Sequence, residues 1–522
     1  MTPLRPNPAR QDQSEVLAFL EKEDPDCKRI DTHASIVFLG RDRVLKVKRA
    51  VRLPFLDYST LEKRKQACEE ELVVNRRFAP QLYRRVVPIT RASSGLEIGG
   101  AGLPIEWAVE MSRFDDGKTF DHLARSGGIT PELAETLAST LRDAHQRAPI
   151  TDGSSWPASI ADIIERNTQV FVNQAELPPD AVRRLDALSH RRLSDCGALL
   201  QARALKGLVR RCHGDAHLGN LVLIDGKPVL FDAIEFDPVI ATTDILYDLA
   251  FPMMDLCHFG LVACANRLFN SYLQASWEEN GTGLRLLPLF LSIRAAIRSN
   301  VLFTKRGLTS DHTPDVNDAR AYFDLALQLI EPARPSLIAI GGKSGTGKSV
   351  LARKIAPLLP PLPGAVLLRS DVIRKALFGV APLASLPQAA YNTETNIRVY
   401  QALIDRSREI VGQGFSAVVD AAFLKAAERN ELAEAASALD VDFRAVFLTA
   451  KLDTRLDRIR SRKNDASDAT PEIAAGQDDY EIGQLDWPTV DASGSPERTL
   501  EQAKPVLVAT SHRMIGDQRS ST

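Results

Sequence analysis

The chain has 522 residues, too many for one compact core, which predicts about three structural units gathered into two functional halves. Its apolar fraction of 44% and charged fraction of 25% are those of an ordinary globular protein and exclude a fibrous or largely disordered chain. A formal net charge of −2 gives no general attraction to nucleic acid or to an anionic membrane.

The cysteines and the chain ends predict a cytoplasmic protein without a membrane partner. Six cysteines are scattered without a C-x-x-C pair or a metal-like spacing, which is typical of reduced thiols. No apolar signal segment is found at the N-terminus, and no later stretch approaches the uncharged apolar length that spans a bilayer. Residues 1–14 are expected to be disordered and residues 511–522 to be a flexible tail. The sequence sets no oligomeric state.

Residues 15–115 are predicted to form a small lobe, a sheet with one helix packed on it. Short runs with strand character lie at residues 35–39, 43–48 and 105–111, and a charged amphipathic helix is expected at residues 61–78. The small lobe would begin a bilobal α+β domain over residues 15–334.

The large lobe, residues 116–334, is predicted to be mostly helical. One pair of short strands interrupts it at residues 221–225 and 228–232, joined by a turn at Gly226. Residues 331–335, Glu-Pro-Ala-Arg-Pro, separate a helical pattern from an apolar run and mark the domain boundary near residue 334.

The main motif of this first half runs from His213 to Asn220 and reads H-G-D-A-H-L-G-N. Together with Asp232 on the next strand pair, it keeps the order and spacing of a protein-kinase catalytic loop and its metal-binding aspartate. Asp215 would be the catalytic base, and Asn220 and Asp232 would supply oxygen ligands to Mg²⁺ ions bound to the phosphates of ATP. A metal site built from His213, His217 and Asp215 is an alternative, which leaves the acidic segment at residues 231–237 unexplained.

A kinase-like half also needs a lysine on its third strand and a glutamate on its helix. Lys46 and Lys48 lie on the same face of one predicted strand, and Lys46 is favoured, although spacing alone does not choose between them. Glu71 is the candidate on the helix. The predicted hinge, which would present backbone groups to adenine, includes Glu110 and Met111.

This half resembles the aminoglycoside-phosphotransferase and choline-kinase branch, whose H-G-D-x-H-x-x-N loop it matches. By that resemblance Asp215 is the base, Asn220 and Asp232 are metal ligands, and Asp244 and Asp248 are structural. Residues 31–42, where the phosphate-covering loop is expected, lack the glycine-rich pattern of protein kinases. The family name implies no particular acceptor.

Residues 335–510 are predicted to form an α/β P-loop NTPase domain with a parallel sheet. Apolar runs at residues 336–340, 365–369, 416–420 and 444–450 alternate with helical segments, which is the pattern of βαβ units.

Residues 342–349 read G-K-S-G-T-G-K-S and fit the pattern G-x-x-x-x-G-K-[ST], directly after a predicted strand and at the start of a helix. Such a loop surrounds phosphate oxygens with backbone N–H groups at a helix N-terminus. The predicted phosphate-binding residues are Gly342, Lys343, Ser344, Gly345, Thr346, Gly347, Lys348 and Ser349. Lys348 should also reach the β- and γ-phosphates as a catalytic residue, and Ser349 should ligate Mg²⁺.

Further motifs indicate how the triphosphate is used. Asp371 and Arg374 have a helical spacing, so the carboxylate can accept the proton of a hydroxyl group while the arginine holds an anionic part of the acceptor. A surface Asp–Arg pair is the alternative. Asp420 ends the third apolar run, where a Walker-B carboxylate holds the water of the metal or orients the acceptor.

Four arginines follow the last of these apolar runs in one helical segment: Arg455, Arg458, Arg460 and Arg462. Some of them are predicted to form a lid over the triphosphate, and Arg458 and Arg462 are the chosen nucleotide-binding candidates. A solvated basic helix face is the alternative.

The second half resembles P-loop kinases that phosphorylate hydroxyl groups, in particular phage-type polynucleotide kinases, zeta toxins and gluconate kinases. The resemblance rests on the P-loop, the D-x-x-R of Asp371 and Arg374, the acidic-to-basic stretch at residues 420–429 and the arginine-rich segment. It implies that Asp371 is the general base and Arg374 an acceptor contact. Residues 335–522 are about neutral in net charge, which disfavours a polynucleotide acceptor without excluding it.

The sequence therefore predicts two fused phosphotransferases that use ATP and Mg²⁺ and act on hydroxyl groups of small-molecule acceptors. The whole architecture resembles bacterial fusion proteins described as predicted kinases. In one alternative, the P-loop half is a 5′-hydroxyl polynucleotide kinase. In another, the kinase-like half senses a ligand without catalysis and regulates the P-loop half.

Overall fold

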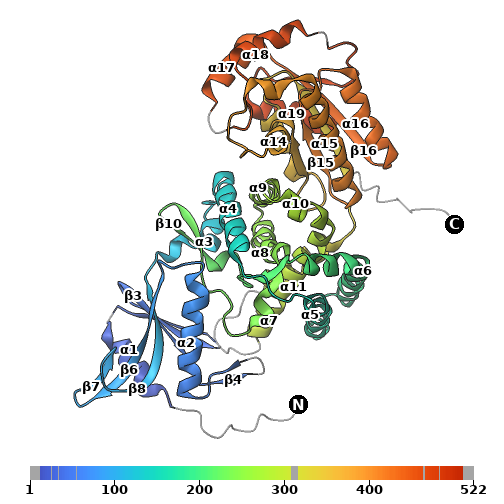
Figure 1. Cartoon of the computed structure of the whole chain (residues 1–522). Helices are drawn as coiled ribbons and strands as arrows, with labels where there is room; N and C mark the ends of the chain where they lie inside the picture. The colour runs from blue at the N-terminus through green and yellow to red at the C-terminus, as the bar shows by residue number, and fades with distance from the viewer. Residues whose placement is uncertain are drawn as a thin grey trace, which may run out of the picture. The chain divides into compact units, whose positions relative to one another are not determined.

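The computed structural model describes residues 12–24, 26–32, 34–53, 56–306, 316–462, 465–480 and 482–508 (Figure 1). Of the ends expected to be disordered or flexible, residues 1–11 and 511–522 lie outside these ranges. By its internal contacts the chain divides into two compact units. The first unit is Met1–Phe259 with Phe290–Ala326, and the second unit is Gly260–Leu289 with Leu327–Thr522.

The first unit begins with a six-stranded sheet in which neighbouring strands are antiparallel. In spatial order the strands are β1 (Lys28–Asp31), β2 (Ser35–Leu39), β3 (Arg43–Lys48), β8 (Leu103–Ser112), β6 (Tyr83–Ala92) and β7 (Gly95–Ile98). Strand β2 occupies residues 35–39 of the segment, residues 31–42, in which the phosphate-covering loop is expected. Helix α1 (Ser14–Glu23) and helix α2 (Leu61–Arg76) both belong to this lobe.

Strand β3 shows how the sheet sorts its side chains, because successive residues of a strand point to opposite faces. Leu45 and Val47 pack in a core cluster with Val16 and Leu20 of α1. On the other face, the lysines that alternate with them in the sequence point toward α2. The hydrophobic alternation thus fixes which face of β3 carries the lysines.

The rest of the first unit is mainly helical, as expected. Its elements include α3 (Phe120–Arg125), α4 (Pro131–Arg147), α5 (Trp156–Phe171), α6 (Pro179–Leu205), β9 (Val209–Arg211), β12 (Thr242–Asp244), α8 (Ile245–His258) and most of α11 (Leu287–Arg306) and α12 (Val316–Ile330). The predicted strand pair is confirmed as β10 (Leu221–Ile224) and β11 (Lys227–Leu230), which are antiparallel. Nearly every residue of α8 is buried, so this helix forms the centre of the helical part.

One stretch, Trp277–Thr304, is long and apolar enough to cross a membrane by length and composition, contrary to the expectation that no stretch approaches that length. Of its most apolar window, 72% is buried inside the fold, as in a core helix. Length and composition alone are weak evidence for a membrane span.

The second unit is built on a five-stranded sheet whose strands all run parallel. In spatial order they are β14 (Val366–Arg369), β15 (Ala417–Asp420), β13 (Ser336–Gly342), β16 (Asp442–Thr449) and β17 (Thr489–Asp491). The helices and short 3-10 turns around it include α13 (Lys348–Ile355), α14 (Ser370–Leu377), η5 (Gln388–Tyr391), α15 (Thr393–Gly412), α16 (Ala426–Ala438), α17 (Leu452–Ser461), α18 (Pro471–Gly476), η6 (Gln477–Asp479) and α19 (Pro496–Leu507). The expected α/β fold with a parallel sheet is confirmed.

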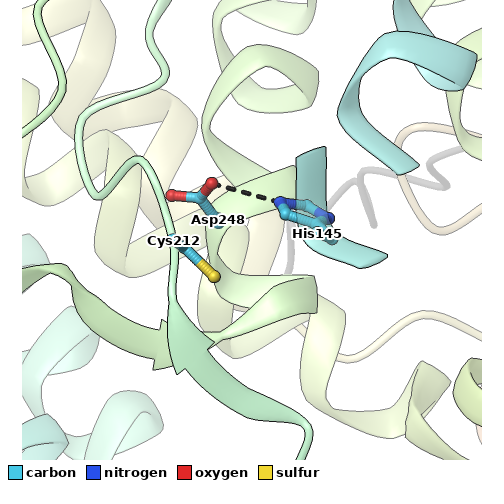
Figure 2. A group of neighbouring side chains, drawn as sticks. All are labelled: His145, Cys212 and Asp248. Atoms are coloured by element: carbon cyan, nitrogen blue, oxygen red, sulfur yellow. Dashed lines mark hydrogen bonds and ion pairs between the residues drawn. The ribbon is translucent and has the colours of Figure 1, made fainter. Parts of the chain in front are cut away.

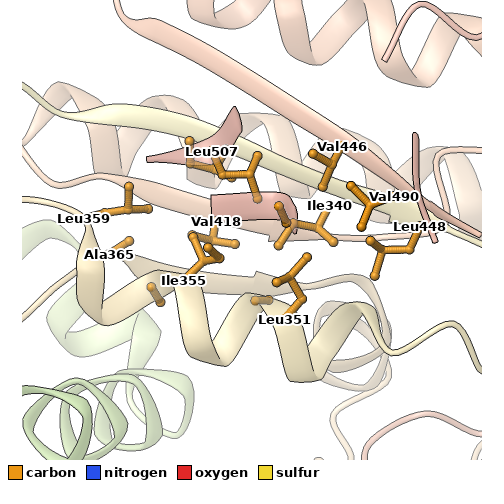
Figure 3. Close-up of a cluster of buried hydrophobic side chains, with 14 of the residues drawn as sticks. Ile340, Leu351, Ile355, Leu359, Ala365, Val418, Val446, Leu448, Val490 and Leu507 are labelled. Carbon is orange, nitrogen blue, oxygen red and sulfur yellow. The ribbon is translucent and has the colours of Figure 1, made fainter. Parts of the chain in front are cut away.

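The main core of the second unit lies between one face of the sheet and α13 and α19. Figure 3 shows Leu351 and Ile355 of α13 gathered with Ile340 and Val418 of the central strands. These strands are buried on both faces, which explains why they appear in the sequence as continuous apolar runs. In a parallel sheet the carboxyl ends meet at one edge, so the loops after β13, β14 and β15 come together there.

The contact units differ from the boundary expected at residue 334, because residues 260–289 group with the second unit. The reason lies in helix α9 (Val262–Gln274), which lies along β14, the edge strand of the parallel sheet. Asn270 accepts a hydrogen bond of 2.7 Å from the backbone N–H of Leu367, and Asn266 donates one of 3.0 Å to the carbonyl of Ala365. The asparagines thereby provide hydrogen-bond partners for backbone N–H and C=O groups that have no neighbouring strand at the edge of the sheet.

Candidate active sites

The P-loop turns from β13 into α13 at the carboxyl edge of the parallel sheet. Gly345 and Gly347 have φ angles of 82° and 94°, left-handed values that glycine adopts readily. A Cβ atom at Gly345 would lie 2.6 Å from the carbonyl oxygen of Arg455. The glycines therefore let the loop pass directly beneath α17.

A pocket of about 810 Å³ opens over this loop and is lined by P-loop residues 344–349. The pocket also brings together predicted site residues from separate segments: Asp371, Arg374, Asp420, Arg458 and Arg462. Gly342 and Lys343 are not part of its wall. The N–H of Gly342 donates to the carbonyl of Ala422 at 3.1 Å, and Lys343 pairs with Asp478 at 2.9 Å. Of the predicted loop, residues 344–349 therefore face the pocket.

The predicted metal ligands Ser349 and Asp420 are direct neighbours. The hydroxyl of Ser349 donates to Oδ2 of Asp420 at 2.5 Å. Arg369, at the end of β14, donates to Oγ of Ser349 at 3.1 Å and to Asp465 at 3.0 Å. Clustered oxygen atoms are the ligands that Mg²⁺ prefers, so the residues present fit this metal. The sequence did not predict that Arg369 contacts Ser349 and Asp465 at this site. In the sequence, Arg369 is only the end of an apolar run.

Lys348 and Asp371 line the same pocket, and burial shifts the pKa of each. Burial lowers the pKa of Lys348, and the charges of Asp420 and Asp371 partly oppose this effect. Burial raises the pKa of Asp371, and the neighbouring charge of Asp420 raises it further, although Arg369 opposes both. A carboxylate with a raised pKa is a better proton acceptor, as a general base requires.

Arg374 is buried, with 7% of its surface exposed. It donates to Oδ1 of Asn396 at 2.8 Å and to the carbonyl of Ala390 at 3.1 Å, while its Nε has no hydrogen-bond partner. Within the described ranges, no carboxylate lies at ion-pair distance from it. The alternative of a surface pair between Asp371 and Arg374 is therefore wrong.

The arginine-rich segment contributes two side chains to the pocket, Arg458 and Arg462. Arg458 donates to the carbonyl oxygens of Thr346 at 3.3 Å and Gly494 at 2.8 Å. Arg462 donates to the carbonyl of Ser467 at 3.3 Å. Both guanidinium groups are thus held at the pocket by backbone carbonyls, as a lid over phosphates would require.

The other two arginines of this segment have different surroundings. Arg455 is 2% exposed and donates to the carbonyl of Ser344 at 2.9 Å, so it fastens α17 to the P-loop. The side chain of Arg460 is 63% exposed and pairs with Asp457. The alternative of a solvated helix face therefore describes Arg460 alone.

In the first unit, the catalytic loop follows β9 and is held by backbone contacts. His213 Nε2 lies 3.0 Å from the carbonyl of Phe231, and burial lowers the pKa of its imidazole. His217 accepts a hydrogen bond at Nδ1 from the N–H of Gly219 at 3.0 Å. These contacts orient the two histidines within the loop, and the alternative metal site of His213, His217 and Asp215 is not among the metal-ligand groups that the described residues form.

Asp215 and Asn220 face each other across the loop. Nδ2 of Asn220 donates to the carbonyl oxygen of Asp215 at 3.0 Å and to its carboxylate at 3.1 Å. The side chain of Asp215 is 40% exposed, so the carboxylate remains open to an acceptor. Because Nδ2 is used in this way, the carbonyl oxygen of Asn220 is the atom that can face a metal.

Lys46 and Lys48 differ in what they contact. Lys46 pairs with Glu71 at 2.8 Å and with Asp232 at 2.6 Å, whereas Lys48 pairs with Glu71 at 2.7 Å and with Glu235 at 2.5 Å. Burial alone would raise the pKa of Asp232, but the ammonium group of Lys46 outweighs it and lowers the pKa. The preference for Lys46 therefore agrees with the geometry, since Lys46 contacts the predicted metal ligand.

The residues predicted to form the hinge, Glu110 and Met111, lie within a strand of the sheet and not in a connecting segment. Glu110 and Met111 lie inside β8, where Glu110 is paired with Leu45 on one side and Arg85 on the other. A central strand uses its N–H and C=O groups within the sheet, so these residues cannot present them to adenine. The chain leaves the sheet only after Ser112, and this corrects the expectation for Glu110 and Met111.

His145, Cys212 and Asp248 lie next to the catalytic loop, with their nitrogen, sulfur and oxygen atoms within 4.8 Å of one another, and Figure 2 shows the contact between Asp248 and His145. One carboxylate oxygen of Asp248 lies 3.1 Å from Nε2 of His145, and the other accepts a hydrogen bond of 2.8 Å from the N–H of Gly214. Burial raises the pKa of the Cys212 thiol well above its ordinary value, so the sulfur stays protonated. Both oxygens of Asp248 already have hydrogen-bond partners, and one of these partners is the N–H of Gly214 in the catalytic loop. We therefore interpret the group as one that positions this loop and not as a metal site.

Comparison with known proteins agrees with this geometry. Residues 39–282 match the phosphotransferase enzyme family, and residues 337–479 match an AAA domain family. Both halves carry kinase domains. The protein is an ATP-dependent phosphotransferase with an aminoglycoside-phosphotransferase-like domain followed by a P-loop kinase domain.

Relatives and solved structures were also found. Uncharacterised proteins of Mycobacterium bovis and Mycobacterium tuberculosis are 29% identical over 490 residues, which is 91% of this chain and 94% of theirs. A choline/ethanolamine kinase family protein from Mesorhizobium loti is 13% identical and covers 58% of this chain and 92% of its own, with a TM-score of 0.34. A gluconokinase from Sinorhizobium meliloti is 20% identical and covers 33% of this chain and 90% of its own, with a TM-score of 0.25.

Proposed function

We propose that each half of the protein transfers the γ-phosphate of ATP to a hydroxyl group of a small molecule, with Mg²⁺ as the metal. For the second unit, we propose further that the acceptor carries a negatively charged group. The observation that supports this is Arg374, a buried guanidinium at the same pocket as Lys348 and Asp371. Burying an unpaired charge is costly, so a site of this kind gains most from an anionic ligand.

The size of the pocket supports a small acceptor. Ligand pockets for small molecules have volumes of roughly 300–1,000 Å³. The pocket of about 810 Å³ falls within that range. In the proposal it holds both the nucleotide and its acceptor. A compact hydroxyl compound with a carboxylate or phosphate group fits this description.

In the proposed reaction at the second unit, the acceptor hydroxyl oxygen bonds to the γ-phosphorus as the bond from that phosphorus to the bridging oxygen of ADP breaks. Asp371 takes the proton of the hydroxyl group. Lys348, Arg458 and Arg462 stabilise the charge on the transferred group. Ser349 and Asp420 would hold Mg²⁺, which supplies neutralising charge to the phosphates when it is bound.

The first unit is proposed to act by the same chemistry with different residues. Asp215 is the base, Lys46 contacts the phosphates, and Asn220 and Asp232 would hold the metal. The pairing of Lys46 with both Glu71 and Asp232 supports a catalytic arrangement rather than a ligand sensor.

The test uses the full-length chain with Asp215→Asn, Asp371→Asn and both changes together, and measures ADP release with a panel of hydroxyl compounds. The panel should include sugar acids, sugar phosphates, neutral and cationic alcohols, and a 5′-hydroxyl oligonucleotide. We expect each single change to abolish a different set of activities and the double change to abolish all of them. Asp405→Asn is a matched control, because the Asp405 side chain is 59% exposed and pairs with Arg408.

Unchanged ADP release in the double variant would contradict the proposal for both halves. If only one of the two single changes lowers ADP release, phosphotransfer is restricted to the half that contains that aspartate. Phosphorylation of the oligonucleotide that Asp371→Asn abolishes would replace the small acceptor of the second unit with a polynucleotide.

A further inference from the structure

We propose that Gln477 is a catalytic residue of the second unit whose side-chain amide donates a hydrogen bond to the γ-phosphoryl group of ATP. The inference rests on the proposed function of this unit. Gln477 begins η6, directly after α18, and lines the pocket above the P-loop. No motif in the sequence marks it.

The orientation of the Gln477 side chain follows from its contact with the P-loop. Its Oε1 accepts a hydrogen bond of 2.7 Å from the backbone N–H of Ser344. A backbone N–H can only donate, so the atom that faces Ser344 has to be the oxygen. The amide nitrogen, with its two N–H donors, is therefore the end left to face a ligand.

The segment that carries Gln477 is held over the P-loop by other side chains. Asp478 pairs with Lys343 at 2.9 Å and with Arg455 at 2.5 Å. Arg455 also donates to the carbonyls of Ser344 at 2.9 Å and Ala474 at 2.6 Å. Because these contacts fasten the segment without Gln477, the position of its amide does not depend on its own hydrogen bond alone.

The pocket wall indicates what the amide faces. Gln477, Ser344, Lys348 and Asp371 all line the same pocket. In the proposed reaction, the transferred phosphoryl group lies between the lysine and the base, at the tip of the loop. A preorganised N–H donor at this place stabilises the charge of the transferred group, and it would contact ATP but not ADP.

The competing explanation is that Gln477 only fastens η6 to the P-loop through Ser344. Glu in its place keeps the contact with the N–H of Ser344, has no N–H to donate and adds a negative charge near the phosphates, so normal binding of ATP by this variant would argue against a donor role. Ala removes both contacts. Gln401→Ala is the matched control, because Gln401 is exposed on α15, contacts Asp405 and does not line the pocket.

The experiment uses the full-length chain with Lys46→Met, which weakens nucleotide binding by the first unit. Affinities for ADP and for the β,γ-imido analogue of ATP are measured by calorimetry with Mg²⁺ and without any acceptor. We expect Gln477→Ala and Gln477→Glu to weaken binding of the ATP analogue by about tenfold or more, as for loss of a hydrogen bond to a charged group. Binding of ADP should change less than about twofold, and Gln401→Ala should change neither affinity.

Two results would overturn the role of Gln477 and leave the proposed function intact. In one, Gln477→Ala weakens the binding of ADP and of the ATP analogue equally, and Gln477→Glu binds both nucleotides normally. The other is unchanged binding by both variants. If the Lys46→Met chain with no change at Gln477 binds neither ADP nor the ATP analogue, the proposed function of the second unit fails, and the role of Gln477 fails with it.

Discussion

Lys46 Nζ lies 2.6 Å from Oδ1 of Asp232, which is 186 positions further along the chain. This contact joins the sheet of the first unit to the strand pair that follows the catalytic loop. Lys48, on the same face of β3, reaches Glu235 instead. Two lysines that look equivalent in the sequence therefore have different surroundings.

Substitution of these lysines should give different results. Lys46→Met should lower phosphotransfer by the first unit by about 100-fold or more, because a charge at the phosphates is lost. Lys48→Met should instead lower the free energy of unfolding by about 3–5 kcal/mol, because buried carboxylates lose a partner. Kinetics and chemical denaturation of both variants check this. An equal loss of activity in the two would contradict the assignment.

The charge of Arg374 should govern acceptor binding at the second unit. Arg374→Gln should raise the KM for an anionic acceptor by about 10–100-fold, the effect of losing charge-assisted hydrogen bonds. Nucleotide affinity should change little. Steady-state kinetics check this, with Arg398→Gln on the exposed side of α15 as the control. An unchanged KM would mean that the acceptor bears no negative group at this position.

The pH dependence of the second unit should reveal Asp371. Because burial and Asp420 raise its pKa, activity should fall on the acid side at a higher pH than for an ordinary aspartate. Arg369 lowers this pKa, so Arg369→Met should raise it and move the acid limb of kcat/KM to still higher pH. Rate profiles of the variant and of Arg398→Met test the direction. A shift toward lower pH would contradict it.

Asp248 should affect both catalysis and acid stability in the first unit. Burial would raise its pKa, but the hydrogen bond from His145 outweighs it and lowers the pKa to about 2. This contribution to stability is present above about pH 4 and is lost as the pH falls toward 2, and it amounts to about 2 kcal/mol. Asp248→Asn should flatten the pH dependence of unfolding in that range and lower kcat, since Gly214 loses its charged acceptor. Denaturation at several pH values and kinetics measure the two effects.

The sequence predicted the site residues that stand in recognisable local motifs, even where the motifs themselves lie far apart in the chain. The P-loop and the catalytic loop each fit within one short segment, so their spacing could be compared with a pattern. The contact of Gln477 with Ser344 spans 133 positions, and that of Arg369 with Asp465 spans 96. No local pattern specifies such contacts, because they depend on how the parallel strands bring loops to one edge.

The error at the hinge has a related cause. Alternating apolar residues predicted the strand that contains Glu110 and Met111, but alternation does not show where pairing with neighbouring strands stops. The strand continues to Ser112 because β3 pairs with it as far as Ser112 and β6 as far as Met111. Tertiary pairing, rather than the local pattern, sets the end of the strand.

Helix α9 bears on whether the two kinase domains can be produced as separate proteins. It lies within the segment that matches the phosphotransferase family, yet its asparagines cover the edge of the parallel sheet. A gene divided at residue 334 would produce a second half with that edge bare, and bare edges pair with other chains. We therefore expect the second half, when it is produced without α9, to associate with other chains, and to stay soluble when α9 is included.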